Sequence, residues 1–402
     1  MSDERREVIV AGGGPAGSAV ACLLAQRGHD VLLVDAARFP RDKVCGEGVS
    51  PEAWRLLDAM GAADRVRALS PRPLHGMLLV SPDGTAFRGE YRGRERPGFA
   101  VRRLAFDAAL LDAARDAGVE VREGVRVTGL VREGGAVAGV VTEAGGEQRT
   151  SRARVTVGAE GRRSVVARSL GLLREHPRMR RFAVRGYWEG VAALGDVGEM
   201  HVGGGGYCGV APLSPTLANV AFVLDRREMG PAGGDLEAFY RGALRRRWPR
   251  LAERLEGARL TSPPRAIGPL ALDCRAVAAP GAVLVGDAAG FYDPFTGEGV
   301  TLALRTAELA AAALDTALAG RASSPLRRLV AYERSRHDAT RDKFRFNRLL
   351  QVAVAWPDAA NAVARRLARR PDLADRLVSI AGDFAPARDA FGPGFLWDLL
   401  TA

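Results

Sequence analysis

Cysteine is scarce in this chain of 402 residues, and its four cysteines stand far apart at positions 22, 45, 208 and 274. The sequence contains no CxxC pair and no spacing typical of metal ligands. It therefore predicts neither a disulfide framework nor a metal site, and it is consistent with a reducing compartment.

Long apolar runs are also missing. No stretch approaches the roughly 20 apolar residues that a membrane-spanning helix needs. The N-terminus is polar and leads directly into a strand pattern, without the charged, apolar and cleavage regions of a signal peptide. We therefore expect a cytoplasmic protein whose contact with membranes is at most peripheral.

Lysine is nearly absent, since Lys43 and Lys343 are the only two, yet the formal net charge is +11. The arginines are spread along the chain rather than gathered in one arm, which argues against a nucleic acid partner and suits an anionic cofactor. Two basic stretches, 343–348 and 365–370, stand near the C-terminus. We favour the interpretation that these stretches belong to a helical cap that closes a ligand-binding cleft. Contact with anionic lipid is the alternative.

A glycine turn stands at the start of the chain. Residues 8–11 read as a strand, 12–17 fit the pattern GxGxxG, and 15–27 read as a helix that Gly28 ends. Asp35 follows the next strand, 18 residues after Gly17, near the spacing of an acid that binds a ribose. Phosphates bind well at the N-terminus of such a helix, so the segment predicts a dinucleotide site.

The rest of the chain divides by its patterns. Residues 181–265 alternate as antiparallel strands, with a four-glycine run at 203–206 and one helix near 236–248, and strand and helix patterns return at 283–285 and 299–319. We predict an α/β fold in which a Rossmann-like domain is interrupted by an antiparallel β-sheet substrate domain and followed by a helical C-terminal segment. The expected parts are 1–180, with a short strand insertion near 76–100, then 181–265, 266–325 and 326–402.

Three segments carry a family resemblance. Residues 283–299, VLVGDAAGFYDPFTGEG, resemble the GD signature of the flavoprotein monooxygenase and geranylgeranyl reductase superfamily. Residues 158–168 resemble its DG motif, with Glu160 where Asp is usual, and residues 39–51 resemble the segment beside the flavin ring in the reductases and the flavin-dependent halogenases. The resemblance implies FAD as the bound cofactor and NADPH or NADH as a transient electron donor.

The motifs and the resemblance together nominate site residues. The expected cofactor-binding residues are Gly12, Gly14, Pro15, Ala16, Gly17, Asp35, Ala36, Arg41, Cys45, Gly46, Arg103, Val127, Glu160, Gly161, Gly286, Asp287, Pro294, Gly297, Gly299 and Val300. Cys45, Tyr207 and His201 are the candidate catalytic residues. Tyr187, His201, Tyr207 and Pro212 are the expected substrate contacts, because their strands should roof the flavin.

The resemblance leaves the reaction open. The favoured interpretation is a single-component, class A hydroxylase-like monooxygenase that forms a flavin C4a-hydroperoxide and acts on a lipophilic or aromatic small molecule. The alternative is a reductase of isolated double bonds, which Cys45 favours and which the loss of bulky aromatics in residues 206–212 disfavours. A halogenase is less favoured because its lysine and WxWxIP stretch are missing, and the intact turn at 297–299 disfavours a flavin-binding protein without activity.

Overall fold

The structure is a computed structural model that describes residues 4–92, 95–176, 179–203, 205–229, 234–319, 327, 329–382, 386–392, 394 and 397–398. Gly204, within the four-glycine run, and the expected boundary between residues 325 and 326 lie outside the described residues. The fold is mixed α/β, as predicted.

A mainly parallel sheet forms the first layer, with strand order β20-β21-β11-β1-β2-β8. Its strands are β1 (Glu4–Ala11), β2 (Val31–Asp35), β8 (Glu120–Glu123), β11 (Glu147–Gly158), β20 (Ala278–Ala279) and β21 (Ala282–Leu284), extended by β9 (Arg126–Glu133) and β10 (Ala136–Ala144). β21 pairs in parallel with β11 although the second sheet separates them in sequence. The chain therefore returns to its first domain, as the sequence predicted.

Helices bury the apolar strands of this sheet. α1 (Pro15–Ala25) packs against both α4 (Arg103–Asp116) and α8 (Gly299–Leu318). Alanine and glycine dominate α1, so these helices approach it closely, and Pro15 opens it at a position where its missing N–H costs nothing. The shorter elements are α2 (Glu52–Ala59), α3 (Ala63–Ala68), α5 (Val165–Ser169), a sheet of β3 (Gly48–Val49), β4 (Arg72–Leu74) and β7 (Gly98–Ala100), and a pair of β12 (Leu173–Glu175) with β19 (Leu272–Cys274).

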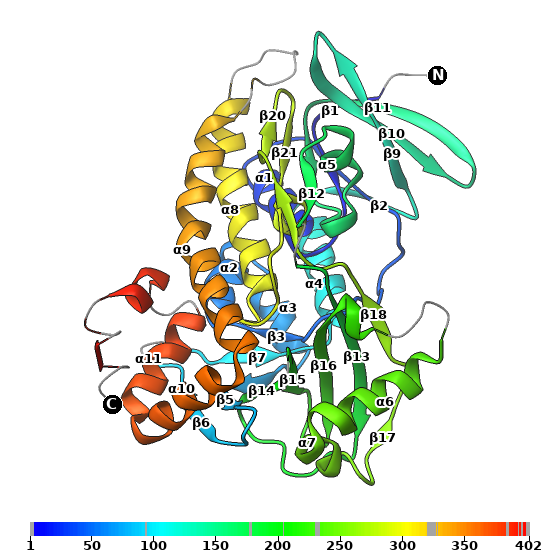
Figure 1. Ribbon diagram of the computed structural model, residues 1–402. Coiled ribbons are helices and arrows are strands. Elements are labelled where there is room, and N and C mark those ends of the chain that lie inside the picture. The colour runs from blue at the N-terminus through cyan, green and yellow to red at the C-terminus, as the bar shows by residue number, and fades with distance from the viewer. Residues whose placement is uncertain are drawn as a thin grey trace.

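The second sheet has strand order β17-β13-β16-β15-β14-β5-β6, and β18 pairs with β13. Its strands are β5 (Gly76–Val80), β6 (Ala86–Glu90), β13 (Arg181–Glu189), β14 (Gly198–Gly203), β15 (Gly206–Pro212), β16 (Leu217–Asp225), β17 (Arg259–Leu260) and β18 (Arg265–Ile267). β5 and β6 come from the expected insertion near 76–100, so they extend the sheet that the sequence placed at 181–265 alone. Figure 1 shows this sheet below the first domain.

The two faces of the second sheet have different partners. One face, which we call the outer face, packs Trp188, Phe222 and Cys208 under α6 (Leu236–Arg247) and α7 (Pro249–Arg254). The other, inner face packs Met200 and Tyr207 against apolar residues of the loop before α8 and of α9 (Val330–Ala355). Because side chains alternate along a strand, each position is committed to one of these faces.

The C-terminal segment is helical, as predicted. α10 (Pro357–Arg369) and α11 (Pro371–Ala381) pack on β6, and α9 runs beside α8 at the edge of the molecule (Figure 1). Among the described residues, no helix is both long enough and apolar enough to cross a bilayer.

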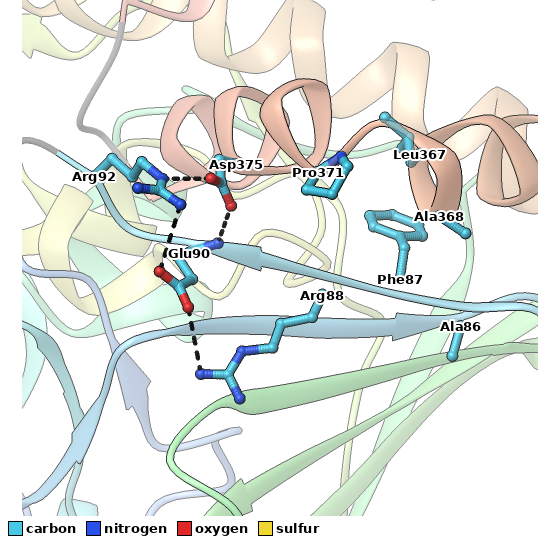
Figure 2. A pocket seen from close by; sticks show the side chains of 9 residues that line it. All are labelled: Ala86, Phe87, Arg88, Glu90, Arg92, Leu367, Ala368, Pro371 and Asp375. Carbon is cyan, nitrogen blue, oxygen red and sulfur yellow. Dashed lines mark hydrogen bonds and ion pairs between the residues drawn. The ribbon is translucent and has the colours of Figure 1, made fainter. Parts of the chain in front are cut away.

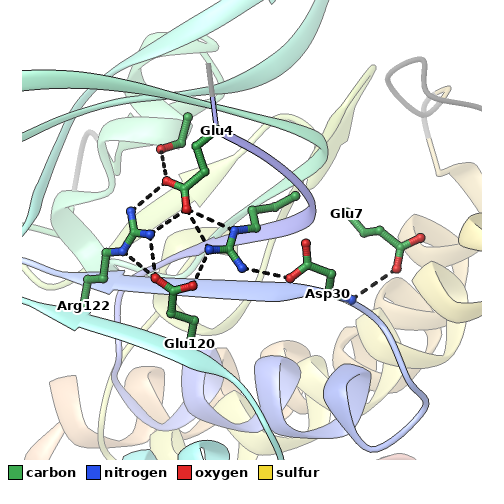
Figure 3. A network of polar contacts seen from close by, with 7 residues as sticks. Glu4, Glu7, Asp30, Glu120 and Arg122 are labelled. Carbon is green, nitrogen blue, oxygen red and sulfur yellow. Dashed lines mark hydrogen bonds and ion pairs between the residues drawn. The ribbon is translucent and has the colours of Figure 1, made fainter. Parts of the chain in front are cut away.

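An ion-pair network ties the starts of three strands together (Figure 3). Arg122 on β8 donates to Glu4 on β1 at 2.6 and 2.8 Å, and Arg6 donates to Glu4 at 2.7 Å and to Asp30 before β2 at 3.0 Å. Arg6 also pairs with Glu120. The network joins neighbouring strands at the sheet edge opposite the glycine turn.

Replacing Glu4 tests this network. Chiefly because Arg122 donates to the carboxylate, with help from Arg6, the pKa of Glu4 is lowered from 4.5 to about 2. A lowered carboxyl pKa stabilises the fold above about 4.5, and this stability is lost as pH falls toward about 2. We expect E4Q to lose about 1 kcal/mol near neutral pH, a figure reduced for solvent screening.

Urea unfolding followed by circular dichroism measures this loss. The gap between E4Q and the natural protein should close as pH falls toward 2. E147Q is the matched control, because Glu147 pairs with Arg149 where both side chains are 74% exposed. A deficit in E4Q that is independent of pH, or an equal deficit in E147Q, would contradict this account.

Candidate active site

The turn between β1 and α1 is so tight that only glycine fits two of its positions. Gly12 has φ of +102°, and a Cβ added there would lie 2.6 Å from the carbonyl oxygen of Ala159. A Cβ on Gly17 would lie 1.8 Å from the carbonyl oxygen of Gly12. Gly14 then precedes Pro15 at the start of α1, whose free N–H groups form an anion site.

Asp35 closes this turn from the end of β2. Its carboxylate accepts hydrogen bonds from the N–H of Gly13 at 2.6 Å and from the N–H of Ala37 at 2.7 Å. Ala36, next to it, is exposed. The carboxylate is therefore fixed beside the glycine turn, where a ribose-binding acid stands in dinucleotide folds.

Two arginines meet on one buried carboxylate near α1. Asp107 is fully buried and accepts from Arg103 at 2.6 and 2.7 Å and from Arg41 at 2.9 Å. A terminal nitrogen of Arg41 lies 3.5 Å from the place that a Cβ on Gly14 would take. The pair of arginines outweighs the single acid, so a net positive charge stands beside the helix N-terminus.

The GD motif packs directly against the glycine turn. Gly286 has φ of +57°, and a Cβ there would lie 2.8 Å from the Cβ of Ala16. Its N–H donates to the hydroxyl of Thr306 on α8 at 3.0 Å. Asp287 follows in a short 3-10 turn. The glycine turn and the GD motif are thus in contact, although some 270 residues separate them.

Lys43 reaches the DG-like motif from the loop that contains Cys45. Its Nζ lies 3.5 Å from the position of a Cβ on Gly161. Burial and the neighbouring Arg103 lower the pKa of Lys43, while Asp287 acts in the opposite direction. The side chain therefore stands between the two motifs that are expected to contact the flavin.

Glu160, the departure from the usual Asp, holds its own loop in place. Its carboxylate accepts from the hydroxyl of Ser164 at 2.6 Å and from the N–H groups of Val165 and Val166 at 3.0 and 3.2 Å. Burial raises the pKa of Glu160. The longer side chain thus caps the start of α5 and leaves the backbone of Gly161 beside Lys43.

A second buried carboxylate, Asp293, joins the GD loop to the inner face. Tyr207 on β15 donates to it at 2.6 Å, Arg181 on β13 pairs with it at 3.1 Å, and Gln351 on α9 donates at 2.7 Å. Burial raises the pKa of Asp293 and, together with the Asp293 charge, the pKa of Tyr207. The ring of Tyr207 also lies edge-on to Phe295, with centroids 4.9 Å apart.

A third buried carboxylate, Glu47, holds the Cys45 loop. Glu47 has a left-handed φ of +61° and is 1% exposed. It accepts from the hydroxyl of Tyr187 at 2.5 Å, from the amide of Asn219 at 3.0 Å and from the N–H of Arg103 at 3.0 Å. Burial raises the pKa of Glu47.

Cys45 is fixed by the same residues. Asn219 donates to the carbonyl oxygen of Cys45 at 2.8 Å, and the N–H of Glu47 donates to its Sγ at 3.3 Å. Cys45 remains partly exposed, and a Cβ on the adjacent Gly46 would meet nothing within 4 Å. The loop is therefore rigid beneath the inner face and open on its other side.

His201 stands apart from these groups. It pairs with Glu199 at 2.9 Å, and Glu199 also accepts from Arg254 on α7 at 2.9 and 3.0 Å. Both His201 and Glu199 therefore point to the outer face, because α7 covers that face. Tyr187 and Tyr207, by contrast, lie on the inner face.

The other candidates lie on the loops and strands around these clusters. Val127 is buried in β9 opposite Thr142, and Pro212 ends β15. The carbonyl of Pro294 accepts from the N–H of Gly297 at 2.9 Å, and a Cβ on Gly297 would meet nothing within 4 Å. Gly299 and Val300 then open α8.

Five residues at these clusters were missed as candidates: Lys43, Glu47, Asp107, Asn219 and Asp293. Four of them had a signal, because Lys43, Glu47 and Asp293 stand inside the quoted motifs and Asp107 follows Arg103 by one helical turn. Asn219 had none, since one polar residue in a strand pattern does not reveal its partners.

A pocket of about 350 Å³ lies elsewhere, between β6 and the helices α10 and α11 (Figure 2). Its lining residues are Ala86, Phe87, Arg88, Glu90, Arg92, Leu367, Ala368, Pro371 and Asp375. None belongs to the three motifs, and its charged groups pair with one another, including Arg92 with Asp375. We therefore place the candidate site at the motifs and not at this pocket.

The residues at the motifs fit FAD. The start of α1 and the paired arginines suit a pyrophosphate, and the acid after β2 suits a ribose. Gly46 and Gly297 leave open space beside two loops that lie near the inner face of the second sheet. A flat ring needs such close approach of backbone.

Comparison with known proteins agrees with this fit. The sequence profile of the FAD binding domain family matches residues 5–195. The chain is 31% identical over 335 residues to a menaquinone reductase of Mycobacterium tuberculosis, covering 78% of each protein. It is 30% identical over 348 residues to a digeranylgeranylglycerophospholipid reductase of Methanosarcina mazei, covering 83% of this chain and 81% of the relative.

Solved structures share the fold. The flavin-dependent brominase Bmp2 superposes with a TM-score of 0.82 at 20% identity, covering 94% of this chain and 93% of the brominase. A flavoprotein from Cytophaga hutchinsonii has a TM-score of 0.84 at 24% identity, covering 96% and 94%. On the similarity to the two reductases, this chain belongs to the FAD-dependent oxidoreductase superfamily that includes them, and it is an enzyme of that superfamily.

Proposed function

We propose that this enzyme is an FAD-dependent reductase that adds hydrogen across an isolated carbon–carbon double bond of a lipophilic, isoprenoid-bearing molecule, with NADH or NADPH as electron donor. The observation that carries the proposal is similarity over about four-fifths of the chain to two enzymes whose names are those of reductases of a quinone and a lipid. The loop that contains Cys45, which resembles that of the geranylgeranyl reductases, supports it.

We assign the cofactor to the motif residues. The start of α1 with Arg41 would bind the pyrophosphate, Asp35 a ribose hydroxyl and Asp287 a ribityl hydroxyl. The start of α8 would stabilise negative charge on the ring, and Lys343 pairs with the nearby Glu298, so that acid does not oppose it. FAD, when bound and reduced, supplies the hydride for the substrate.

Residues above the ring would orient the substrate and provide the proton. The N–H of Glu47 donates to the Cys45 Sγ and Asn219 donates to the Cys45 carbonyl oxygen. We assign to Cys45 the proton that adds to the second carbon of the double bond. Tyr187 and Tyr207 would line the space and exclude water. His201 receives no role, because it points to the outer face.

A NAD(P)H-dependent monooxygenase is the second candidate. Residues 206–212 lack the bulky Trp and Phe positions of the reductases, and Tyr207 is the aromatic residue that β15 retains. A roof with less aromatic bulk would leave room for an aromatic substrate in place of an extended chain. In this case the bound cofactor would supply the activation of O2, with one oxygen atom entering the substrate and the other leaving as water.

Turnover without oxygen separates the two candidates. The holoenzyme is incubated anaerobically with NADPH or NADH and either menaquinone or a digeranylgeranylglycerophospholipid, and the products are analysed by mass spectrometry. We expect a product heavier by two hydrogen atoms, formed equally in air. A substrate that is unchanged without O2 and gains one oxygen atom in air would replace the reductase with the monooxygenase.

Removing the hydroxyl of Tyr207 tests the role of this residue in turnover. Y207F removes one bond to the buried Asp293, which Arg181 and Gln351 still hold, so the GD loop should loosen only where it meets the second sheet. A hydrogen bond to a charged group contributes roughly 1.5–3 kcal/mol, so we expect turnover to fall about tenfold or more. FAD content should stay unchanged, because the ADP-binding turn is not touched.

Y240F is the matched control for Y207F. Tyr240 is equally buried and hydrogen-bonded, but it stands on α6 against the outer face. Turnover by Y240F should match that of the natural enzyme once the folded fraction is corrected. Normal turnover by Y207F would remove Tyr207 from the substrate side.

A further inference from the structure

The last turns of α9 and the residue that follows this helix expose apolar side chains to solvent. Leu349 is 45% exposed, Val352 54% and Trp356 66%. Leu349 and Val352 stand three residues apart on one side of α9, and Trp356 is the extended residue that joins α9 to α10. Large apolar side chains that are exposed together in this way are typical of a surface that binds a protein or a membrane.

Arginines continue the same side of α9 toward its start. Arg341, Arg345 and Arg348 are exposed and follow the spacing of four and three residues. Asp342 lies 3.3 Å from Arg341 and 3.8 Å from Arg345, and Asp338 is exposed one helical turn before them, so the three arginines outnumber two acids. Asp358 is exposed just beyond, at the start of α10. We call residues 341, 345, 348, 349, 352 and 356 the α9 strip.

The opposite side of the same turns is part of the site. Asn347 donates to the carbonyl oxygen of Asp293 at 3.1 Å, and Gln351 donates to its carboxylate. Val354 packs in the cluster that contains Tyr207. One helix, roughly 10 Å across, therefore separates the α9 strip from the residues proposed to line the substrate space.

We propose that the α9 strip docks on an anionic lipid bilayer. A tryptophan and two aliphatic side chains suit the boundary between headgroups and acyl chains, and the arginines suit anionic headgroups. A second copy of the chain is a poorer occupant, because a twofold contact would bring the arginines of both strips together. Docking would bring Asp293 and Tyr207 next to the lipid phase; only this consequence rests on the proposed function.

Sedimentation with vesicles tests the proposal. The holoenzyme is mixed with sucrose-loaded vesicles of phosphatidylcholine alone or with added phosphatidylglycerol. We expect binding that needs the anionic lipid and weakens with salt. Replacing both Val352 and Trp356 by Ser should weaken vesicle binding about tenfold or more. In R341S/R345S, each replaced arginine should weaken vesicle binding about fivefold.

Two matched variants control for general effects. V330S removes an aliphatic side chain that is 45% exposed at the other end of α9, and R149S removes an arginine that is 74% exposed on the hairpin between β10 and β11. Both should bind vesicles as the natural protein does. FAD absorbance of each variant verifies that the fold is intact.

Specific outcomes would overturn the proposal. These are no binding to anionic vesicles, equal binding by V352S/W356S, or a dimer that dissociates on this double replacement and binds no vesicles. The assay contains no substrate or NADPH. Vesicle binding by an enzyme that reduces no double bond would therefore disprove the proposed function alone, and the converse would disprove the docking alone.

Discussion

Backbone contact at the carboxyl edge of the first sheet is the constraint on which the structure depends. Gly12, Gly17 and Gly286 lie where any Cβ would meet a neighbouring backbone or side chain within 2.8 Å. These positions bring the end of β1, the start of α1 and the turn after β21 together. This chain leaves the first domain, forms most of the second sheet and then returns to complete the edge with β21.

Because side chains alternate along its strands, the second sheet packs one face against helices and turns the other face to the candidate site. Its outer face is an apolar cluster under α6 and α7, where His201 and Glu199 pair with Arg254. Its inner face carries Tyr187 and Tyr207, whose hydroxyls donate to the buried carboxylates of Glu47 and Asp293. Buried acids are costly unless partnered, so Glu47 and Asp293 fix the distance between roof and loops.

Local sequence predicted the elements that local physics determines. The strand at 8–11, the glycine turn, the acid at position 35 and the return at 283–299 all follow from short-range patterns. The pairing of β5 with β14 did not, because parallel strand pairing between distant segments leaves no trace in either one. For the same reason the side on which His201 points could not be read from its strand.

The residues of the candidate site divide in the same way. Motif positions such as Gly12 and Asp287 could be nominated from the sequence, because their expected role depends on backbone shape close by, and that role stays a prediction. The bonds that hold Cys45 were not, because Asn219 reaches it across 174 residues of sequence. Glu160 was recognised as a departure, but only the fold shows that its longer side chain caps α5.

Hydrogen exchange with and without FAD tests the location of the site most directly. The account predicts slower exchange on FAD binding at the amides of residues 12–18, 41–48 and 286–299, with no change around the pocket between β6 and α10. Unchanged exchange at these three segments, or protection centred on that pocket, would contradict it.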